Sequence, residues 1–200
     1  MRKLFLLLFV LFAASISAQA QHYPKGEAWG TYSLFRADID ILDNETLHGY
    51  GLGAQWNLSP YFGIAGEFTS NHGASGPVSV FLPGVVVLIP ELDTTVRTFV
   101  GGPRVSYRAK PVTVFAHALF GGANSQLRDE KGTSGFNEDN TEFAMVFGGG
   151  IDVNIGKHYA IRAAQFDYVP IHTDINVRFG GGSSSWLHNT RYQAGFVFKF

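Results

Sequence analysis

The sequence contains no cysteine among its 200 residues. This absence excludes a disulfide framework, a cysteine-based metal site and the cysteine-linked anchor of a lipoprotein. An excess of one charge is also lacking, because 15 Lys and Arg stand against 16 Asp and Glu. No basic stripe points to nucleic acid. The seven histidines are scattered, with no His-x-x-x-His spacing for a metal ion. The sequence therefore predicts neither a cofactor nor a metal site.

The chain also lacks an apolar run that could cross a membrane as a helix. Its longest run, Leu4 to Ala14, falls short of the ~20 residues that a spanning helix needs. Arg2 and Lys3 precede this run, and Ala18-Gln19-Ala20 supplies a small-x-small cleavage pattern. We therefore predict a secretory signal peptide over residues 1–20, cleaved after Ala20, in preference to an uncleaved membrane helix. Any membrane residence of the mature chain must then come from strands.

Glycine and aromatic residues are abundant, and the aromatic ones follow a pattern at the end of the chain. The stretch Thr190 to Phe200 alternates strictly, with Tyr192, Ala194, Phe196, Phe198 and Phe200 on one face. A period of two is the signature of a strand. A soluble edge strand with such a face would be an aggregation hazard. The pattern instead favours a strand that faces lipid on one side and a packed polar interior on the other.

Residues 21–200 divide into eight segments of strand length, which predict a single all-β domain. The segments are Glu27 to Arg36, Leu47 to Leu58, Phe62 to Thr69, Thr95 to Tyr107, Val112 to Gly122, Glu142 to Asn154, Tyr159 to Val169 and Thr190 to Phe200. Long and short connections alternate between them, as in outer-membrane barrels with short periplasmic turns and long external loops. We therefore predict an eight-stranded antiparallel up-and-down transmembrane β-barrel with both termini on the periplasmic side. A soluble β-sandwich or a lipocalin-like barrel is the main alternative fold.

The mature chain resembles the family of eight-stranded outer-membrane barrels that includes the OmpA barrel and the OmpX and Ail-type proteins. The resemblance rests on GYGLGAQWNLSPYFGIAGEF (Gly49 to Phe68), GGPRVSYR (Gly101 to Arg108), QFDY (Gln165 to Tyr168) and the terminal GFVFKF. It implies residence in the bacterial outer membrane among outer-membrane lipids. It also implies that Tyr192, Phe196, Phe198 and Phe200 form the signal read by the barrel-assembly machinery.

Six ionisable residues fall on the inward face of the predicted strands: Glu67, Arg104, Asp152, Asp167, Arg191 and Lys199. His117 is placed inward with them. An eight-stranded barrel is only wide enough for its own side chains, so buried charges must pair. Adjacent strands bring Asp167 to Arg191 and Glu67 to Arg104. We interpret these residues as a polar core that fills the lumen, with a narrow pore or proton path as the alternative.

Arg162 breaks the alternation. If Gln165 and Asp167 face inward, strict alternation points Arg162 toward lipid near the periplasmic rim. It could extend its guanidinium to the headgroups, or a bulge could turn it inward.

The connection from Pro77 to Pro90 is the candidate binding loop. VSVFL and VVVLI flank Pro83-Gly84 and read as two short apolar strands around a turn. Each is too short to span a bilayer, so ten barrel strands are a minor alternative. The ribbon either extends the barrel wall above the membrane or binds a surface ligand through Val80, Phe81, Val86 and Leu88.

The sequence predicts a monomeric, non-enzymatic barrel with a structural or surface-display role. The alternatives are a porin-like solute path and a lipid-modifying enzyme. For the enzyme, His188 and Thr190 share a face near the outer rim, as in the His-x-Ser pattern of outer-membrane lipid A deacylases. The match is poor, because Thr replaces Ser and no carboxylate is assigned to orient the histidine.

Overall fold

The computed structural model describes residues 23–37, 45–75, 78–82, 85–89, 92–129, 137–177 and 181–200. The predicted signal peptide lies outside the described residues. The regular elements are β1 (Gly26–Ala37), β2 (Glu45–Asn57), β3 (Phe62–Ser75), β4 (Val78–Leu82), β5 (Val85–Ile89), β6 (Leu92–Arg108), β7 (Val112–Asp129), β8 (Asn137–Asn154), β9 (Tyr159–Val177) and β10 (Gly181–Lys199). Within the described part of the chain, no helix is long and apolar enough to cross a membrane.

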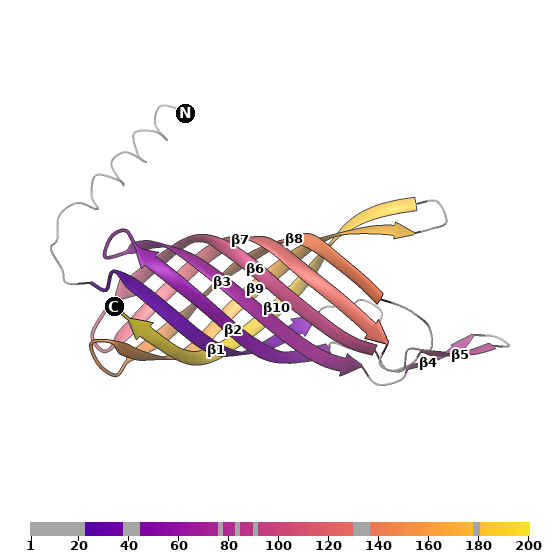
Figure 1. The fold of residues 1–200 in the computed structure, drawn as a ribbon, viewed down its shortest axis with the longest axis horizontal. Coiled ribbons are helices and arrows are strands. Elements are labelled where there is room, and N and C mark those ends of the chain that lie inside the picture. The colour runs from indigo at the N-terminus through magenta and orange to yellow at the C-terminus, as the bar shows by residue number, and fades with distance from the viewer. Residues whose placement is uncertain are drawn as a thin grey trace, which may run out of the picture.

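Eight of the strands close into a barrel in the order β1-β10-β9-β8-β7-β6-β3-β2 (Figure 1). Every neighbouring pair is antiparallel, and β1 closes the barrel against β10 from Glu27↔Lys199 to Arg36↔Thr190. The strands β4 and β5 pair only with each other in a separate two-stranded sheet. The prediction of eight barrel strands is confirmed, and the ten-stranded alternative is wrong.

The two ends of the barrel differ, and we call them the terminus end and the loop end. At the terminus end, Gly26 and Phe200 exchange backbone hydrogen bonds of 3.0 and 2.9 Å. The three tight connections lie at this end, where Leu58 N donates to Phe62 O (2.9 Å) and Ala109 N donates to Val112 O (2.8 Å). In the first turn the Ser59 hydroxyl also accepts from Phe62 N at 2.9 Å, which fixes the chain reversal.

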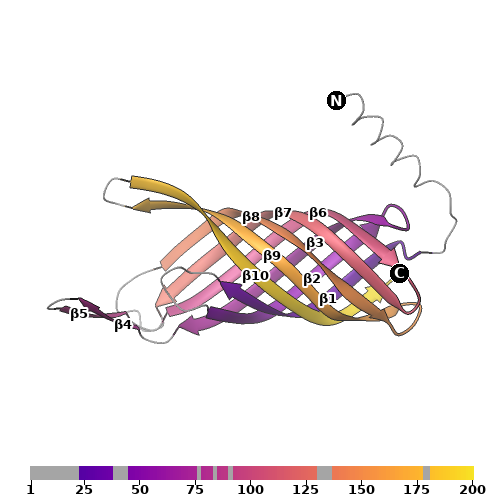
Figure 2. The ribbon, with the colours of Figure 1, turned by 180° about the vertical axis from the view of Figure 1, so that it is seen from behind.

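The strands at the loop end are longer than the alternation of apolar residues predicts. We predict an end at Gly122 for the strand that the structure continues to Asp129 as β7. Likewise β9 runs on to Val177 and β10 begins at Gly181, across most of a predicted connection. Beyond the bilayer a strand needs no apolar outward face, so the alternation fades while the backbone pairing continues. Figure 2 shows the β9–β10 hairpin and the β4–β5 ribbon extending past the barrel wall.

The outer face of the barrel is apolar and the inner face carries the charges. Outward residues along successive strands, such as Leu52, Ile64 and Phe196, are 54%, 55% and 73% exposed. Inward residues such as Glu67 and Arg104 are 4% and 1% exposed. A soluble barrel has the opposite distribution, so the β-sandwich and lipocalin-like alternatives are wrong. An exterior of this kind requires lipid as its solvent.

A β-bulge turns Arg162 into the lumen. The register of β9 shifts against β8 between Ile151 and Asp152, and against β10 between Gln193 and Gly195. The extra residue restores the inward phase, so both Arg162 and Gln165 are buried, at 0% and 1% exposure. Of the two alternatives for this arginine, the bulge is confirmed.

A glycine of β10, opposite the bulge in β9, allows β10 to lie close to β1. A Cβ at Gly195 would lie 2.1 Å from the Gly30 carbonyl oxygen and 2.6 Å from Thr31 Cα, both backbone atoms of β1. We expect Gly195→Ala to destabilise the folded barrel by about 1–3 kcal/mol. The measurement is the fraction of heat-modifiable band on unboiled gels after refolding at increasing urea.

Gly156→Ala is the matched control, because a Cβ at this turn position meets nothing within 4 Å. We expect this variant to refold like the wild type. Equal urea midpoints for the Gly195 and Gly156 variants would contradict the assigned contact between β10 and β1.

Candidate functional site

A central network of buried charges crosses the lumen. Arg191, on β10, donates to Asp167 Oδ2 from Nη2 (2.8 Å) and Nε (3.0 Å), and also donates to Glu67 Oε1. Glu67 is on β3, which is not a neighbour of β10 in the barrel order. The guanidinium also donates from Nη1 to the hydroxyls of Thr69 (2.9 Å) and Thr98 (3.3 Å). One side chain therefore joins opposite walls of the barrel.

Four further side chains complete the central network. His117 Nε2 lies 3.0 Å from Asp167 Oδ1, and Gln165 Nε2 donates to Asp167 Oδ2 at 2.8 Å. Gln193 Nε2 donates to Glu67 Oε1 at 3.0 Å, and Trp29 Nε1 donates to Glu67 Oε2 at 3.3 Å. Each carboxylate thus accepts several hydrogen bonds, as a buried charge requires.

A second group, the lower cluster, lies nearer the terminus end and contains Glu27, Asp152, Arg104 and Arg162. Arg162 Nε donates to Asp152 Oδ1 at 2.9 Å, and Arg104 Nη2 donates to Asp152 Oδ2 at 3.4 Å. Glu27 Oε2 lies 3.9 Å from Arg104 Nη2. Its other oxygen, Oε1, accepts from Arg108 Nη2 at 2.7 Å.

Two aromatic rings hold the paired guanidiniums of the lower cluster. The Cζ atoms of Arg104 and Arg162 lie 3.7 and 4.5 Å from the centroid of the Phe115 ring. The same atoms lie 4.9 and 4.7 Å from the Trp29 ring. Each cation therefore faces aromatic π-density, which offsets part of the repulsion between them.

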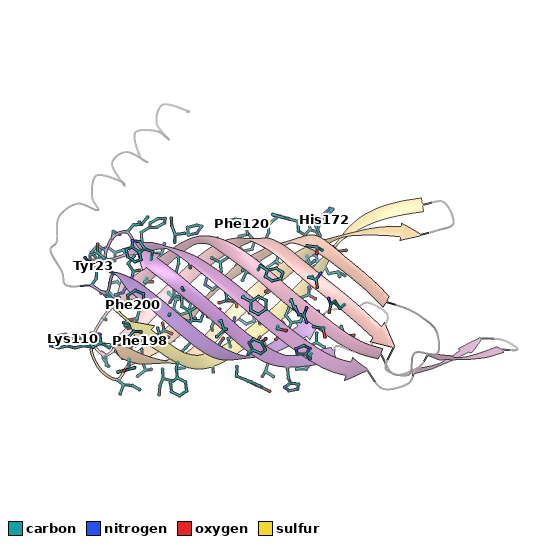
Figure 3. The ribbon with its side chains drawn as sticks, in the orientation of Figure 1. Tyr23, Lys110, Phe120, His172, Phe198 and Phe200 are labelled. Atoms are coloured by element: carbon teal, nitrogen blue, oxygen red, sulfur yellow. The ribbon has the colours of Figure 1, made fainter. Side chains whose placement is uncertain are left out.

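A pocket of about 500 Å³ opens below the lower cluster, at the terminus end. Tyr23, Tyr61, Arg108 and Lys110 contribute to its lining, and Figure 3 shows Tyr23 and Lys110 at this end. Arg108 Nη2 donates to Glu27 Oε1 at 2.7 Å and to Asn57 Oδ1 at 2.9 Å. This guanidinium therefore links the pocket wall to the lower cluster.

Apolar side chains fill the loop-end half of the lumen. The buried residues there include Phe35, Leu47, Val96, Leu119, Val146, Val169 and Ile171. They belong to six different strands and to one hydrophobic cluster. The loop-end half of the lumen is thus mainly apolar, with Asn71 and Asn189 also buried there, whereas the sequence alone predicts a polar core that fills the lumen. The sequence signal for this apolar half is a strand with apolar residues on both faces, such as β7.

All six charged residues predicted to face inward are buried, with exposures of 6% or less. The expected contact of Asp167 with Arg191 is present. The expected neighbour of Glu67 is wrong, because the β3–β6 register sets Arg104 beside Gly63, four residues from Glu67. Glu67 pairs with Arg191 instead, and Arg104 pairs with Asp152.

Sequence reasoning missed three members of these groups: Glu27, Trp29 and Arg108. Glu27 and Trp29 precede Thr31 and Ser33 in the inward series of β1, so the same alternation could have found them. The partners of Arg162 depend on the bulge, for which the sequence carries no comparable signal.

The residues predicted as an assembly signal lie on the outer face of β10. Tyr192, Phe196, Phe198 and Phe200 are 52%, 73%, 44% and 54% exposed. The rings of Phe198 and Phe200 stack with centroids 6.0 Å apart, and Figure 3 shows both at the terminus end. Recognition by an assembly machinery stays a prediction.

The candidate binding loop forms a β-ribbon outside the barrel sheet. The register places Val80 opposite Val87, Phe81 opposite Val86 and Leu88 opposite Ser79. The ribbon lies beyond the loop end of the barrel (Figure 1). Its position agrees with an extension past the membrane, and its binding role stays a prediction.

The candidate catalytic pair lies on the outer wall of β10. His188 is exposed on the outer face, and its Nδ1 is hydrogen-bonded to the hydroxyl of Tyr168. The two rings stack at 5.8 Å with an interplanar angle of 11°. Tyrosine thus occupies the position that an orienting carboxylate would need. Among the described residues no group of three or more His, Asp or Glu side chains could hold a metal ion.

Comparisons with known proteins agree with this architecture. A family model described as "Outer membrane protein beta-barrel domain" matches residues 4–200. No curated protein sequence matches the chain.

Several solved structures share the fold. Neisserial surface protein A aligns with a TM-score of 0.64 at 10% identity, over 90% of this chain and 100% of its own. Ail of Yersinia pestis, solved with the heparin analogue sucrose octasulfate, aligns at 0.52 with 16% identity, over 88% and 99%. OprG from Pseudomonas aeruginosa aligns at 0.51 with 13% identity, over 90% and 97%.

Removing the cation of the central network tests its contribution to stability. Arg191→Ala leaves Glu67 and Asp167 buried without their shared cation. Breaking a buried pair from one side costs about 3–5 kcal/mol. We expect the urea midpoint of the refolded protein in lipid vesicles, followed by tryptophan fluorescence, to fall accordingly.

Lys110→Ala is the control, since this lysine is exposed in a turn and should leave the midpoint unchanged. The triple variant Glu67→Gln, Asp167→Asn, Arg191→Met removes all three fixed charges, and we expect it to be more stable than Arg191→Ala. A triple variant that is less stable than the single one would contradict charge pairing as the reason for the loss.

Proposed function

We propose that this chain, which belongs to the outer membrane protein β-barrel domain family and resides in the bacterial outer membrane, binds surface partners through its loop-end elements. In this proposal the barrel is a rigid, non-enzymatic support. Its short turns face the periplasm and its long hairpins face outward. Loops on rigid scaffolds are the usual place for binding residues.

The observation that carries the proposal is the closed lumen. Arg191 joins β10 to β3 across the barrel axis, and buried apolar residues such as Phe35 and Leu47 lie on the loop side of it. A solute path would have to break these contacts at a cost of several kcal/mol. The central network therefore favours a structural use of the interior and leaves the loop end for interaction.

The β4–β5 ribbon is the proposed binding element. Its ten strand residues include no charge and a single polar residue, Ser79. Because the sheet has two strands, each strand has one edge without a pairing strand in the described structure. An apolar ribbon with open edges, held outside the barrel, fits an apolar partner surface through Val80, Phe81, Val86 and Leu88.

The sequence of the long connections is mostly acidic, which restricts the charge of a binding partner. Asp38, Asp40 and Asp43 follow β1, and Glu91 and Asp93 border the start of β6. Acidic residues outnumber basic ones in the first three of the four long connections with their strand ends. A polyanion such as the heparin analogue bound by Ail would be repelled there. The proposed partner is therefore an apolar surface with neutral or positive charge. Host-cell lipid is the first ligand to test.

Adhesion of whole bacteria tests the ribbon. Replacing Val80, Phe81, Val86 and Leu88 with Thr keeps strand propensity and removes the apolar groups. We expect bacteria with the wild-type protein to bind immobilised phosphatidylcholine bilayers, and the four-Thr variant to lose most of that binding. Ser79→Thr is the control and should bind like the wild type.

The four-Thr variant could bind as well as the wild type while it still shows the heat-modifiable band. This result would contradict the assignment of the ribbon as the binding element. Binding that increases when the bilayer is made anionic would contradict the proposed charge limit.

Planar-bilayer recording separates this proposal from the channel alternative. We expect no discrete conductance steps from the wild-type protein, because the central network and the apolar cluster close the lumen. Steps that change in size with Glu67→Gln or Arg104→Gln would support a solute path instead. The mass profile of outer-leaflet lipid, unchanged by expression and by His188→Ala, likewise separates it from a lipid-modifying enzyme.

A further inference from the structure

The pocket at the terminus end lies in the mouth of the barrel. Its lining comes from the segment before β1, the β2–β3 turn, the β6–β7 turn and the end of β8. These segments border β1, β2, β3, β6, β7 and β8, which are consecutive in the closed barrel order. The pocket therefore lies across the end of the lumen and not on the lipid-facing wall. Its volume of about 500 Å³ is that of a site for a small organic ligand.

Positive charge exceeds negative charge in the lumen next to this pocket. The lower cluster contains two arginines and two carboxylates, and Arg108 and Lys199 add two cations on its pocket side. Lys199 Nζ donates to Asn154 Oδ1, and Asn154 lines the pocket. The central network, with two carboxylates around Arg191, offsets part of this excess from the far side. The remaining positive charge favours an anion in the pocket.

Arg108 connects this buried charge to the pocket wall. Its Nη1 donates to the carbonyl oxygen of Pro60, and its Nη2 donates to Glu27 and Asn57. Its Nε is buried and has no hydrogen-bond partner among the described residues. These contacts fix the position of the guanidinium and leave part of its donor capacity unused. The pocket therefore has a fixed cation in its wall.

Lys110 is the exposed cation of the lining. It lies in the β6–β7 turn, two residues after Arg108, and Figure 3 shows it at the terminus end. Its ammonium has three donors. Among the described residues the lining contains neither Asp nor Glu. The ammonium can therefore donate to an acidic group that enters the pocket.

Rings form the other part of the lining. Tyr23 and Pro24 contribute two of them, and Pro60 and Tyr61 contribute two more. An inorganic anion would fill the charged part of the pocket and leave these ring surfaces in water. A peptide end supplies a carboxylate for the cations, and its amide planes and small side chains can pack against the rings. The mixed lining thus favours a peptide carboxylate over a free inorganic anion.

We propose that this pocket binds the C-terminal carboxylate of short peptides. Lys110 and Arg108 attract the carboxylate, and Tyr23 and Tyr61 pack against the peptide body. In the orientation proposed above, the pocket opens to the periplasm. It lies at the end of the barrel opposite to the β4–β5 ribbon, so this assignment goes beyond the surface-binding role and does not depend on it.

Isothermal titration calorimetry of the folded protein in detergent micelles tests the assignment. The probe is acetyl-dialanine with a free carboxylate, and the comparison ligand is the same peptide with a C-terminal amide. The test variant Lys110→Gln removes the exposed cation and keeps a polar side chain. Lys157→Gln is the matched control, because this lysine is exposed in another turn at the same end and lies outside the lining. Each variant is first checked for the heat-modifiable band.

We expect the wild type and Lys157→Gln to bind the acid at least about tenfold more tightly than the amide. In Lys110→Gln the affinity for the acid should fall about three- to tenfold, because one exposed charge-assisted hydrogen bond is lost. Its affinity for the amide should not change. Tyr61→Ser removes a ring and should weaken the acid and the amide by the same factor. For the wild type, added salt should weaken the acid and not the amide.

Three results would overturn the proposal. The first is equal affinity of the wild type for the acid and the amide, or no binding of either. The second is an equal loss in Lys110→Gln and Lys157→Gln, which would mean that the whole terminus end attracts the acid and the pocket does not select it. The third is displacement of the peptide by an equal concentration of acetate or inorganic phosphate, which would indicate a general anion site that makes no use of the peptide body.

Discussion

The contact of Arg191 with Glu67 and Asp167 is the interaction on which the rest of the barrel depends. A narrow barrel cannot admit enough water to solvate ionised side chains, so each carboxylate must find its donors inside. Arg191 meets this requirement for two carboxylates at once and ties β10 to β9 and β3. The side chains around it, His117 and Gln165 among them, use the remaining acceptor sites. The wall is therefore braced from within.

Alternation and connection length make the architecture of this chain predictable, because lipid contact imposes a strict period of two. The terminal strand and β2 show that period without interruption, and the short turns after Asn57, Arg108 and Asn154 follow from their breaker residues. Pairing inside the lumen is harder to predict. The β3–β6 register separates Glu67 from Arg104. A register is set by the pairing of two strands, so it cannot be predicted from the sequence of either strand alone.

The orientation of Arg162 cannot be predicted from the alternation of residues alone. Its orientation depends on one extra residue in β9, which shifts the register of this strand against both β8 and β10. A sequence pattern records that the alternation fails but not which way the backbone bends. The apolar half of the lumen is a related case, since β7 is apolar on both faces and periodicity cannot tell them apart. Only closure of the barrel decides that Leu119 lies inside and Phe120 outside.

The exposed side chains at the terminus end and at the loop end of the barrel wall differ, although closure of the barrel does not require a difference. Either rim could carry aromatic residues, as Trp56 and Tyr107 do at the terminus end. The loop-end half of the wall adds histidines to its aromatic residues, and two of them, His48 and His188, are hydrogen-bonded to tyrosines. An unpaired hydroxyl or ring nitrogen is costly in hydrocarbon, so this pairing suits the edge of the apolar band. The tyrosine–histidine pairs toward the loop end and the aromatic side chains at the terminus end therefore mark the two edges of the apolar band. The β4–β5 ribbon lies beyond the loop-end edge (Figure 1).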